Sequence, residues 1–531
     1  MIHMQVEPLG ISVEMEKGKT IREGLEQVDI RLESPCGGLG SCGSCGVWVQ
    51  PAANVPPTPH KNISSSKAAK GFRLACMAVP EGDITIRLID RYVYDKKQLD
   101  QGNRILLHRG RGTGKPAGPA DGEKRQAKGL AIDIGTTTMG LLLVDLQTGE
   151  IMASEAGLNP QTANGFDVVS RIHYANTDQR RQEMATLVQD TLNRFIRDAC
   201  TKASIKAEEI IDICIGANTT MLQMAAGMDC ASIVRSPFHF SVKGGTDYPA
   251  SLFGLHVNEA AKVYLPPVMH AFVGTDISAG LLLCPEFFDT EKIVLFIDMG
   301  TNGEMCLNVR RNWFTTSTAA GLAFEGMGLS SGMRASDGAV EKVEFTEGKL
   351  RFTTIGGKPV KGICGSGIID FLAVLLKAGF LETSGRMAGP ETLGPYGRNI
   401  DGQPAIQYGE GIYLTQKDIR QLQLAKGAVR TGIDMILKKR GMDSQGLDRI
   451  YLAGGFGNYL NPFNLEAIKL MPAHTANKIV FCGNTSIEGA ALLLTDVKKR
   501  SLLESSLGRM VYVALAALPE FNTSFVANLD F

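Results

Sequence analysis

Four cysteines near the N-terminus have the spacing of a metal-binding set. Cys36, Cys42 and Cys45 stand in a glycine-rich stretch with the pattern Cys-x5-Cys-x2-Cys, and Cys76 follows in GFRLACMAVP. Three thiolates on one loop, with a fourth from elsewhere in the chain, suit a [2Fe–2S] cluster. Structural zinc sites prefer two short Cys-x2-Cys pairs, and Cys76 has no neighbouring cysteine. The pattern favours the cluster over the two alternatives, zinc and free thiols.

A stretch further along the chain could bind a phosphate together with a metal ion. In GLAIDIGTTT, residues Gly129–Thr138, an apolar run ends at Asp133 and is followed by a turn and a second apolar run. Glycine lets an anion approach the backbone N–H groups of such a turn, and hydroxyl groups add donors. A carboxylate beside the turn can hold a hard cation or its water. Plain hairpins also have this pattern; the candidate ligands are Gly135, Thr136, Thr137 and Thr138.

The same design recurs in IVLFIDMGTNGE, residues Ile293–Glu304. The apolar run ends at Asp298, and a return strand follows the turn. Two copies of the design indicate a site for a metal-bound phosphate more strongly than either copy alone. The candidate ligands of this second turn are Gly300, Thr301, Asn302 and Gly303. A third glycine turn, which contains Gly454 and Gly455 in LAGGFGNY, follows another apolar run.

The composition limits the possible functions. Lysine plus arginine and aspartate plus glutamate balance at 55 each in 531 residues, which argues against a nucleic-acid or anionic-membrane surface. No apolar run has the length of a membrane span, and the N-terminus lacks the apolar block of a signal peptide. We therefore expect a cytoplasmic protein. In that reducing compartment the 11 cysteines are ligands or core residues rather than disulfides.

The order of patterns predicts several domains. Residues 1–90 combine strand-like runs with the cysteine loop, as in a β-grasp [2Fe–2S] ferredoxin-like domain of the α+β class. Residues 91–128 are polar and then rich in glycine, proline, lysine and arginine, which predicts a linker. Residues 129–531 alternate apolar runs with helical patterns and predict an α/β body. Within it, residues 168–199 are helical in pattern.

For several other residues of the α/β body, the sequence allows two possible roles. The helix predicted for Thr415–Arg440 begins with a capping box of Thr415 and Asp418, and its Lys426 and Arg430 either reach a nucleotide or face solvent. Asp276 is interpreted as a helix cap in preference to a cleft carboxylate. Asn218 either lines a cleft or forms a turn. Two longer segments complete these predictions: residues 318–340 fold over the site or against a partner, and residues 377–413 form a loop-rich surface excursion.

The two turns and the later AGGFGN turn resemble those of the acetate kinase/sugar kinase/Hsp70/actin superfamily. The resemblance implies a duplicated α/β ATPase fold, with halves at about 129–290 and 291–531. It implies that both turns clamp the phosphates of ATP and that the Gly454-Gly455 turn lies against adenosine. Asp133 and Asp298 would hold Mg²⁺ through water. Glu304 is then the candidate for a water-orienting carboxylate.

The ferredoxin unit, the linker and the ordered motifs DIGTTT, DMGTNGE, ICGSGIID and AGGFGN resemble the ATP-dependent reductive activators of corrinoid proteins. Such proteins deliver one electron to cob(II)alamin, which restores cob(I)alamin, and ATP hydrolysis drives the transfer. The implied cofactors are a [2Fe–2S] cluster, ATP and Mg²⁺. The implied partners are a corrinoid protein of a methyltransferase or O-demethylase system and an external low-potential electron donor. The family alone suggests a homodimer.

Two other functions fit parts of the sequence. One is an ATP-dependent electron donor to another low-potential enzyme, similar to the activators of 2-hydroxyacyl-CoA dehydratases. Those activators usually hold a [4Fe–4S] cluster between subunits and lack a ferredoxin domain, so the cysteine loop argues against this function. The other is a redox-sensing nucleotide-binding protein without turnover. The presence of both Asp133 and Asp298 argues against it.

Overall fold

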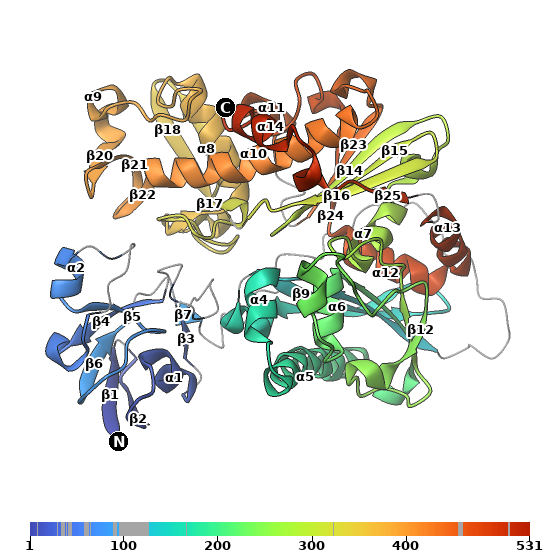
Figure 1. The fold of residues 1–531 in the computed structure, drawn as a ribbon, viewed down its shortest axis with the longest axis horizontal. Helices are drawn as coiled ribbons and strands as arrows, with labels where there is room; N and C mark the ends of the chain where they lie inside the picture. Colours follow the sequence, from blue (N-terminus) through green and yellow to red (C-terminus); the bar gives the residue numbers. More distant parts are fainter. Residues whose placement is uncertain are drawn as a thin grey trace.

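The computed structural model describes most of the chain, as an N-terminal domain and a larger α/β body (Figure 1). The described residues are 1–7, 9–28, 30–32, 38, 40, 45–57, 63, 65–88, 93–94, 127–165, 167–321, 323–454, 460–507 and 510–531. The linker predicted for residues 91–128 lies almost wholly outside these residues. Its boundaries therefore stay a prediction.

The N-terminal domain is a mixed sheet with a short helix packed on it. The elements are β1 Ile2–Glu7, β2 Ile11–Met15, α1 Ile21–Glu26, β3 Arg31–Leu32, β4 Gly46–Gln50, α2 Ser65–Ala69, β5 Phe72–Leu74, β6 Ile84–Arg87 and β7 Val93–Tyr94. The main sheet has the order β2-β1-β6-β4-β5, in which β1 is antiparallel to β2 and parallel to β6. Alternate residues of β1 face the core, because side chains of a strand alternate between its faces. Ile21 and Leu25 of α1 close this core.

The first half of the α/β body is built on a sheet of order β10-β9-β8-β11-β13-β12. The strands are β8 Lys128–Ile134, β9 Thr138–Asp145, β10 Ile151–Leu158, β11 Ile210–Ala217, β12 Thr246–Pro249 and β13 Lys262–Leu265. The helices are α4 Val168–Tyr174, α5 Asp178–Ala203, α6 Thr219–Ala225 and α7 Thr275–Gly280. Residues 168–199, predicted to be helical, divide into α4 and α5. The chain breaks after Tyr174, and Thr177 caps α5 by accepting a bond from the N–H of Arg180.

The second half repeats this plan with a sheet of order β24-β23-β14-β15-β16-β25. The strands are β14 Ile293–Met299, β15 Gly303–Val309, β16 Asn312–Thr318, β23 Arg449–Ala453, β24 Ile479–Gly483 and β25 Met510–Tyr512. The larger helices are α8 Gly365–Lys377, α10 Gln416–Lys438, α11 Pro462–Ala467, α12 Thr485–Thr495, α13 Val497–Leu507 and α14 Phe521–Ala527. In each half an antiparallel meander, β8-β9-β10 or β14-β15-β16, is extended by a parallel strand, β11 or β23.

Helices α7 and α12 interlock the two halves. Ile487, Ala490 and Leu493 of α12 belong to one core with Ala131 and Leu142 of the first sheet. Conversely, residues of α7 pack with strands of the second sheet, in a core that contains Ile277, Leu281, Val294 and Phe296. Each helix therefore follows the strands of its own half in sequence and buries apolar side chains against the other half. This exchange fixes the turns at the ends of β8 and β14 relative to each other.

Residues 377–413 are more ordered than the sequence suggests. They contain α9 Pro390–Leu393, β20 Gly397–Ile400 and β21 Gln403–Gly409, and β22 Ile412–Thr415 completes a small sheet of order β20-β21-β22. Leu393, Ile406 and Leu414 are buried in the main core of the second half. The prediction of a loop-rich surface excursion is wrong. A second small sheet, β18-β17-β19, is formed by β17 Ala339–Thr346, β18 Lys349–Thr354 and β19 Gly362–Ile363.

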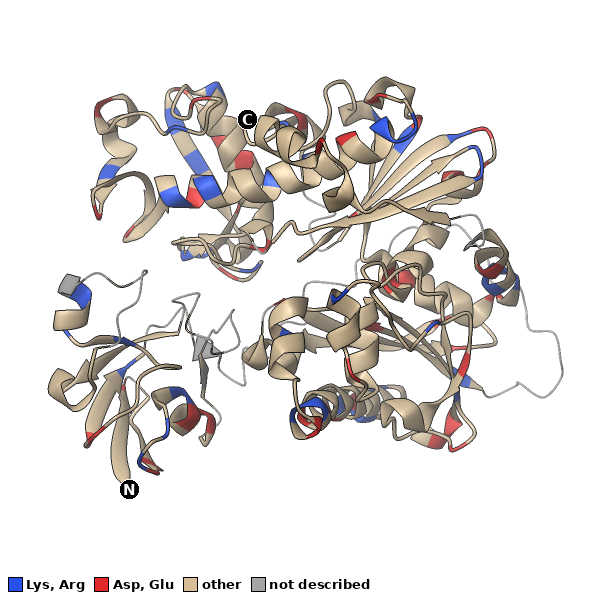
Figure 2. Ribbon diagram, viewed as in Figure 1, with Lys and Arg blue, Asp and Glu red and all other residues tan. Residues whose placement is uncertain are grey.

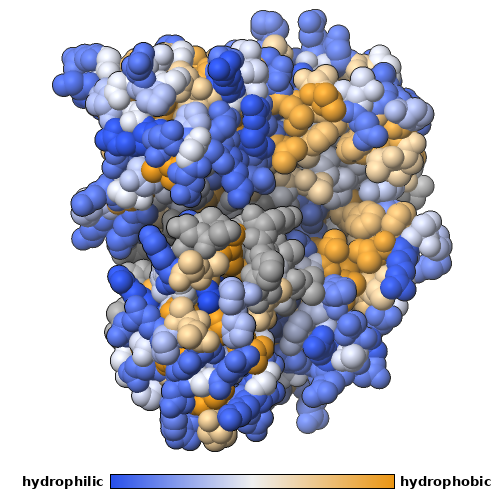
Figure 3. Space-filling model, turned by 60° about the vertical axis from the view of Figure 1, so that its left-hand side comes forward, coloured by the Kyte–Doolittle hydropathy of each residue, from blue (hydrophilic) through white to orange (hydrophobic). Residues whose placement is uncertain are grey.

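The surface mixes charged and apolar residues. Figure 2 shows acidic and basic residues interspersed along α5 and α13. Figure 3 shows separate hydrophobic patches on a largely hydrophilic face. Exposed large apolar side chains, such as Val169 and Phe463, come from different elements. Within the part of the chain that the structure describes, no helix combines the length and apolarity that a membrane crossing requires.

Helix α10 has the predicted cap, but its Lys426 is buried. Thr415 and Asp418 form the capping box. The Lys426 side chain is fully buried, and its Nζ donates to the carbonyl oxygens of Asn528 and Asp530, both at 2.6 Å. Arg430 pairs with Asp434 at 2.9 Å. Both proposed readings of Lys426 are therefore wrong, because the C-terminal segment covers it.

We predict that Lys426→Met weakens the attachment of the C-terminal segment. Removing Nζ leaves two carbonyl acceptors without their donor, which costs about 1–3 kcal/mol of unfolding free energy. Burial lowers the pKa of Lys426 to about 8 from its ordinary 10.5. Between these values the unfolded chain binds more protons than the folded one, so the stability of the wild type rises with pH. Denaturant unfolding of both proteins from pH 8 to pH 10 should show a widening difference.

The matched control is Lys417→Met, which changes an exposed lysine on the same helix. Its unfolding free energy should stay within ~0.5 kcal/mol of the wild type. Equal losses in both variants would contradict the anchoring role of Lys426.

Candidate iron–sulfur centre and nucleotide cleft

Strand pairing in the N-terminal domain brings two of the predicted cluster ligands together. Cys45 immediately precedes β4 and Cys76 follows β5, and these strands are antiparallel, with Gly46 opposite Leu74. The two Sγ atoms are 3.2 Å apart, close enough to ligate one metal ion. Cys36 and Cys42 lie outside the described residues. The donor chemistry of the described pair fits the predicted cluster, and the four-ligand set stays a prediction.

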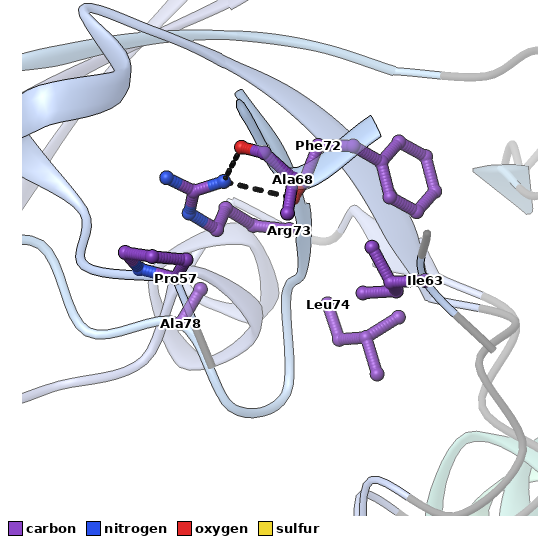
Figure 4. A pocket seen from close by; sticks show the side chains of 7 residues that line it. All are labelled: Pro57, Ile63, Ala68, Phe72, Arg73, Leu74 and Ala78. Atoms are coloured by element: carbon purple, nitrogen blue, oxygen red, sulfur yellow. Dashed lines mark hydrogen bonds between the residues drawn. The ribbon is translucent and has the colours of Figure 1, made fainter. Parts of the chain in front are cut away.

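Hydrogen bonds of the Arg73 side chain hold the strand that leads to Cys76. Figure 4 shows Arg73 in a small pocket lined by Pro57, Ala68 and Leu74 among others, with its guanidinium bonded to the carbonyl oxygens of Ala68 and Phe72. Burial lowers the pKa of Arg73 from its ordinary value. Arg73 is thus one of the residues that line this pocket, and its hydrogen bonds support the strand that leads to Cys76.

The first predicted phosphate turn joins β8 to β9 and is held by other segments. Asp133 at the end of β8 is buried, and it accepts hydrogen bonds from Asn484 and from the Ser486 hydroxyl, both at 2.8 Å. These donors lie at the start of α12, in the other half of the fold. Gly135 is required sterically, because a Cβ at this position would lie 2.6 Å from the carbonyl oxygen of Thr138.

The carbonyl oxygens of this turn are bound from the protein side. The Asn159 side chain donates to the Gly135 carbonyl, and the Asn159 backbone N–H donates to the Thr137 carbonyl, both at 2.9 Å. The Thr136 carbonyl accepts from the fully buried Arg171. Burial lowers the pKa of Arg171 to about 9, against the opposing pull of Asp167 and Glu325. A positive charge therefore lies directly behind the turn, which favours an anion in front of it.

The second predicted turn joins β14 to β15, where Met299 pairs with Gly303 and Asp298 pairs with Glu304. Gly454 lies against this strand end. Its φ is +106°, and a Cβ there would be 2.2 Å from the Met299 carbonyl oxygen and 3.1 Å from an Asp298 carboxylate oxygen. Gly454 is thus brought to the predicted metal-binding aspartate. Gly455 lies outside the described residues.

A single carboxylate joins the two turns. Glu325 accepts from the Thr137 hydroxyl at 3.0 Å and from the Thr301 hydroxyl at 2.7 Å, and the two hydroxyls are 3.4 Å from each other. Glu325 belongs to the glycine-dense segment over residues 318–340. Through Glu325 that segment contacts both predicted phosphate turns; its predicted role of folding over the site or against a partner stays a prediction. We name the contact of Glu325 with Thr137 and Thr301 the clasp.

Four carboxylates face this region with raised pKa values. Burial, followed by the charge of Asp133, raises the pKa of Asp298 to about 7. Burial and the charges of Asp298 and Asp133 raise the pKa of Asp276 to about 8. Burial raises the pKa of Asp133, and burial with Asp276 and Asp298 raises that of Glu304 well above its ordinary value. Such crowding favours a bound cation.

The donor set fits Mg²⁺ held in part through water. Carboxylate oxygens are its preferred protein ligands, and Mg²⁺ usually keeps several waters. Among the residues that the structure describes, no three His, Cys, Asp or Glu side chains form a complete metal site by themselves. The carboxylates of Asp133 and Asp298 are the predicted ligands, and both lie beside the turns.

For three residues beside the two turns, the role predicted from the sequence was wrong or absent. Asp276 was interpreted as a helix cap, which is wrong, because the N-cap of α7 is Gly274 and Asp276 lies among the carboxylates. Asn484 and Ser486 had no predicted role. They stand in Gly-Asn-Thr-Ser after a strand, which parallels Ala-Asn-Thr-Thr at residues 217–220, and that repetition was the available signal.

Asn218 caps a helix and also contacts the first predicted turn. Its side-chain oxygen caps α6 by accepting from the N–H of Met221, and its Nδ2 donates to the Thr136 hydroxyl at 2.9 Å. The same residue therefore ends β11, starts a helix and lines the first turn.

The fold and its sites define a class: a [2Fe–2S] ferredoxin domain in one chain with a duplicated α/β nucleotide-binding fold. Three family models match in order. These are the 2Fe-2S iron-sulfur cluster binding domain over residues 4–81, the RACo middle region over residues 128–285, and the C-terminal ASKHA domain of RACo over residues 292–531. The ASKHA domain implies nucleotide binding.

Two similar proteins and one solved structure agree with these models. The chain is 31% identical over 428 residues to the corrinoid activation enzyme RamQ of Eubacterium limosum, covering 78% of this chain and 72% of RamQ. It is 24% identical over 432 residues to the [Co(II) methylated amine-specific corrinoid protein] reductase of Methanosarcina barkeri, covering 76% of this chain and 77% of that reductase. A solved reductive activator for corrinoid, iron-sulfur protein superposes with a TM-score of 0.71 and 27% identity over 100% of this chain and 98% of its own.

The chain belongs to the RACo family. The predicted family and the predicted fold class, a ferredoxin-like domain followed by a duplicated actin/Hsp70-like ATPase fold, are thereby confirmed. The boundaries at residues 90 and 128 and the roles of individual site residues remain predictions.

We predict that Glu325→Gln tightens nucleotide binding about tenfold. In the clasp, the Glu325 carboxylate occupies the hydroxyls of Thr137 and Thr301 and adds negative charge where phosphates are expected. The variant keeps the shape and removes the charge, so an anion meets less repulsion. Titration calorimetry with Mg-ADP would measure the dissociation constant. Asp337→Asn, in the same segment but exposed, is the control. Weaker binding by Glu325→Gln would mean that Glu325 holds the nucleotide instead of competing with it.

Proposed function

We propose that this chain reactivates a corrinoid protein by passing one electron from its [2Fe–2S] cluster to cob(II)alamin, which gives cob(I)alamin. Reductive activation of corrinoid proteins is the activity of the RACo family, to which the chain belongs. ATP hydrolysis between the two halves drives the transfer. The observation that carries the proposal is the combination in one chain of the Cys45–Cys76 pair with two threonine turns that meet at one point.

The chain's own residues divide the work of nucleotide binding. The backbone and hydroxyls of residues 135–138 and 300–303 bind phosphates, and Arg171 supports the first turn electrostatically. Asp133 and Asp298 would hold Mg²⁺ through water. Mg²⁺, when bound, would supply positive charge to the phosphates and offset the crowded carboxylates. Gly454, together with Gly455, is the proposed contact for adenosine.

The proposed water-orienting group is Glu304, and the structure adds Asp276 as a neighbour of the same kind. The charges of Asp276 and Asp298 raise the pKa of Glu304, and the charges of Asp298 and Asp133 raise the pKa of Asp276. A group that handles protons near neutral pH works best with a pKa near the working pH. Asp276, with a pKa raised to about 8, meets this condition more closely than a carboxyl in free solution.

ATP hydrolysis can be coupled to electron transfer only if the affinity for the partner protein's two states depends on which nucleotide is bound. An ATPase shifts an unfavourable transfer only through different affinities for the two states of its partner. For one electron, a tenfold change in equilibrium corresponds to about 59 mV. We propose that docking of the corrinoid protein removes an axial ligand of the cobalt and that ATP hydrolysis resets the complex.

The resemblance to the family is the basis for the proposed partner, electron donor, compartment and oligomeric state. The partner is a corrinoid protein of a methyltransferase or O-demethylase system, and the electron comes from an external low-potential donor. The protein works in the cytoplasm as a homodimer, without nucleic acid or membrane as partners. The relatives named for corrinoid activation and for a methylated amine-specific corrinoid protein support the partner class.

We predict that Asp298→Ala lowers ATP hydrolysis and corrinoid reactivation at least ~100-fold, the usual scale for loss of one electrostatic group in an active site. The iron–sulfur absorption should be unchanged, since Asp298 lies at the turn after β14 and not in the N-terminal domain. Phosphate release and the cob(I)alamin absorption would be followed in the same anaerobic assay.

Asp289→Ala is the matched control, because Asp289 is exposed and precedes the opposite end of β14. It should retain full activity. Normal reactivation by Asp298→Ala would remove Asp298 from the proposed site.

A further inference from the structure

Arg22 of helix α1 lies at the junction between the iron–sulfur domain and the nucleotide half. Its side chain is 9% exposed. Its Nε donates to Glu26 at 2.7 Å, and its Nη2 donates to the carbonyl oxygen of Ala163 in the first half of the α/β body. Figure 1 shows the N-terminal domain beside the lobe that contains α4 and α5. A mostly buried guanidinium thus spans the boundary between two domains that bind different cofactors.

On one side, Arg22 is tied to the cysteine segments. Its backbone N–H donates at 3.0 Å to the carbonyl oxygen of Ala75, the residue before Cys76. A Cβ at Gly38 would lie 2.4 Å from Nη1 of Arg22 and 3.9 Å from the Cβ of Cys76. Gly38 belongs to the cysteine loop between Cys36 and Cys42, and its φ is +93°. The guanidinium therefore occupies the space that a side chain in this loop would need.

On the other side, Ala163 belongs to a short 3₁₀ helix that holds the first phosphate turn. This helix, Pro160–Asn164, is capped by Asn159. Asn159 bonds the carbonyl oxygens of Gly135 and Thr137. Gln161 of the same helix accepts at 3.2 Å from Arg171, which bonds the carbonyl of Thr136. All three carbonyls of the turn are therefore bound by the helix that Arg22 contacts, or by a side chain attached to it.

We infer that Arg22 couples the redox state of the cluster to the occupancy of the nucleotide turn. This inference rests on the proposed function, because it takes the cysteine loop to bind the cluster and the turn to bind nucleotide. Reduction adds one negative charge beside the guanidinium, which strengthens its attraction to the cysteine loop. Nucleotide binding orders the turn and, through Asn159 and the 3₁₀ helix, the carbonyl that Arg22 bonds. Arg22 is a positioning residue in this scheme.

Coupling of this kind is reciprocal. If nucleotide changes the reduction potential of the cluster, reduction must change nucleotide affinity by the same free energy. A tenfold difference in Mg-ADP affinity between the oxidised and reduced protein corresponds to a shift of about 59 mV for a one-electron couple. Both quantities are measurable on the full chain without any corrinoid protein.

The experiment is a pair of linked measurements under anaerobic conditions. The midpoint potential is determined by dithionite titration, followed by the electron paramagnetic resonance signal of the reduced cluster, with and without saturating Mg-ADP. The dissociation constant of Mg-ADP is measured for the oxidised and the reduced protein. For the wild type we expect a potential shift and a matching affinity ratio of about tenfold.

Three variants separate coupling from folding. Arg22→Gln should keep the cluster and bind Mg-ADP but lose the potential shift. Arg22→Lys keeps the charge with a different reach and should retain a reduced shift; it also decides the test if Arg22→Gln fails to assemble the cluster. Lys67→Gln is the control, since Lys67 of the N-terminal domain pairs with Asp401 of the second half at 3.7 Å and both side chains are exposed. It should behave as the wild type.

The outcomes distinguish this inference from the proposed function. A wild type that binds Mg-ADP and holds the cluster but shows no shift overturns the coupling alone. If the Arg22→Gln variant retains the full nucleotide-dependent shift in midpoint potential, other residues carry the coupling and the role of Arg22 is overturned. A wild type that does not bind Mg-ADP overturns the proposed function and the inference together.

Discussion

The structure depends on the meeting of two turns from opposite halves of the chain at the carboxylate of Glu325. Thr137 and Thr301 are 164 positions apart in sequence, yet both donate to Glu325 and their hydroxyl oxygens are 3.4 Å apart. The exchange of α7 and α12 between the halves makes this possible, because each helix buries apolar side chains against the sheet of the other half. Two hydroxyls at this distance leave no room for a phosphate between them. In the proposed function, a phosphate bound between the turns would therefore have to break the clasp.

The same arrangement concentrates negative charge. Asp133, Asp276, Asp298 and Glu304 lie close together beside the two turns. Asp133 raises the pKa of Asp276 and of Asp298, and Asp276 and Asp298 raise that of Glu304. Asn484 and Ser486 reach across from α12 to bond Asp133, which opposes the rise of its pKa and keeps its oxygens oriented. Behind the first turn, the buried Arg171 adds the opposite charge. The positive charge of Arg171 therefore lies behind the first turn, and the carboxylates lie beside it. This arrangement suits the proposed metal-bound phosphate.

Local sequence signals predicted the elements that depend on neighbours in the chain. The capping box of Thr415 and Asp418 and the paired strands around both turns arise from contacts between residues that are close in sequence. The sequence could not predict contacts made by distant segments. Lys426 is covered by residues more than 100 positions away, Asp276 is drawn among carboxylates of another half, and Asn484 reaches Asp133 across 351 positions. The small sheet of β20, β21 and β22 was missed because its short strands are stabilised by burial against the main core.

The central claim is that ATP drives one-electron reduction of a corrinoid. The most direct measurement is anaerobic absorption spectroscopy of a cob(II)alamin-loaded corrinoid protein from the same pathway, mixed with this protein and a low-potential reductant, with and without Mg-ATP. The account predicts the cob(I)alamin spectrum only when Mg-ATP is present. Formation of cob(I)alamin at the same rate without nucleotide, or bleaching of the iron–sulfur bands while cobalt stays Co(II) in the presence of Mg-ATP, would contradict it.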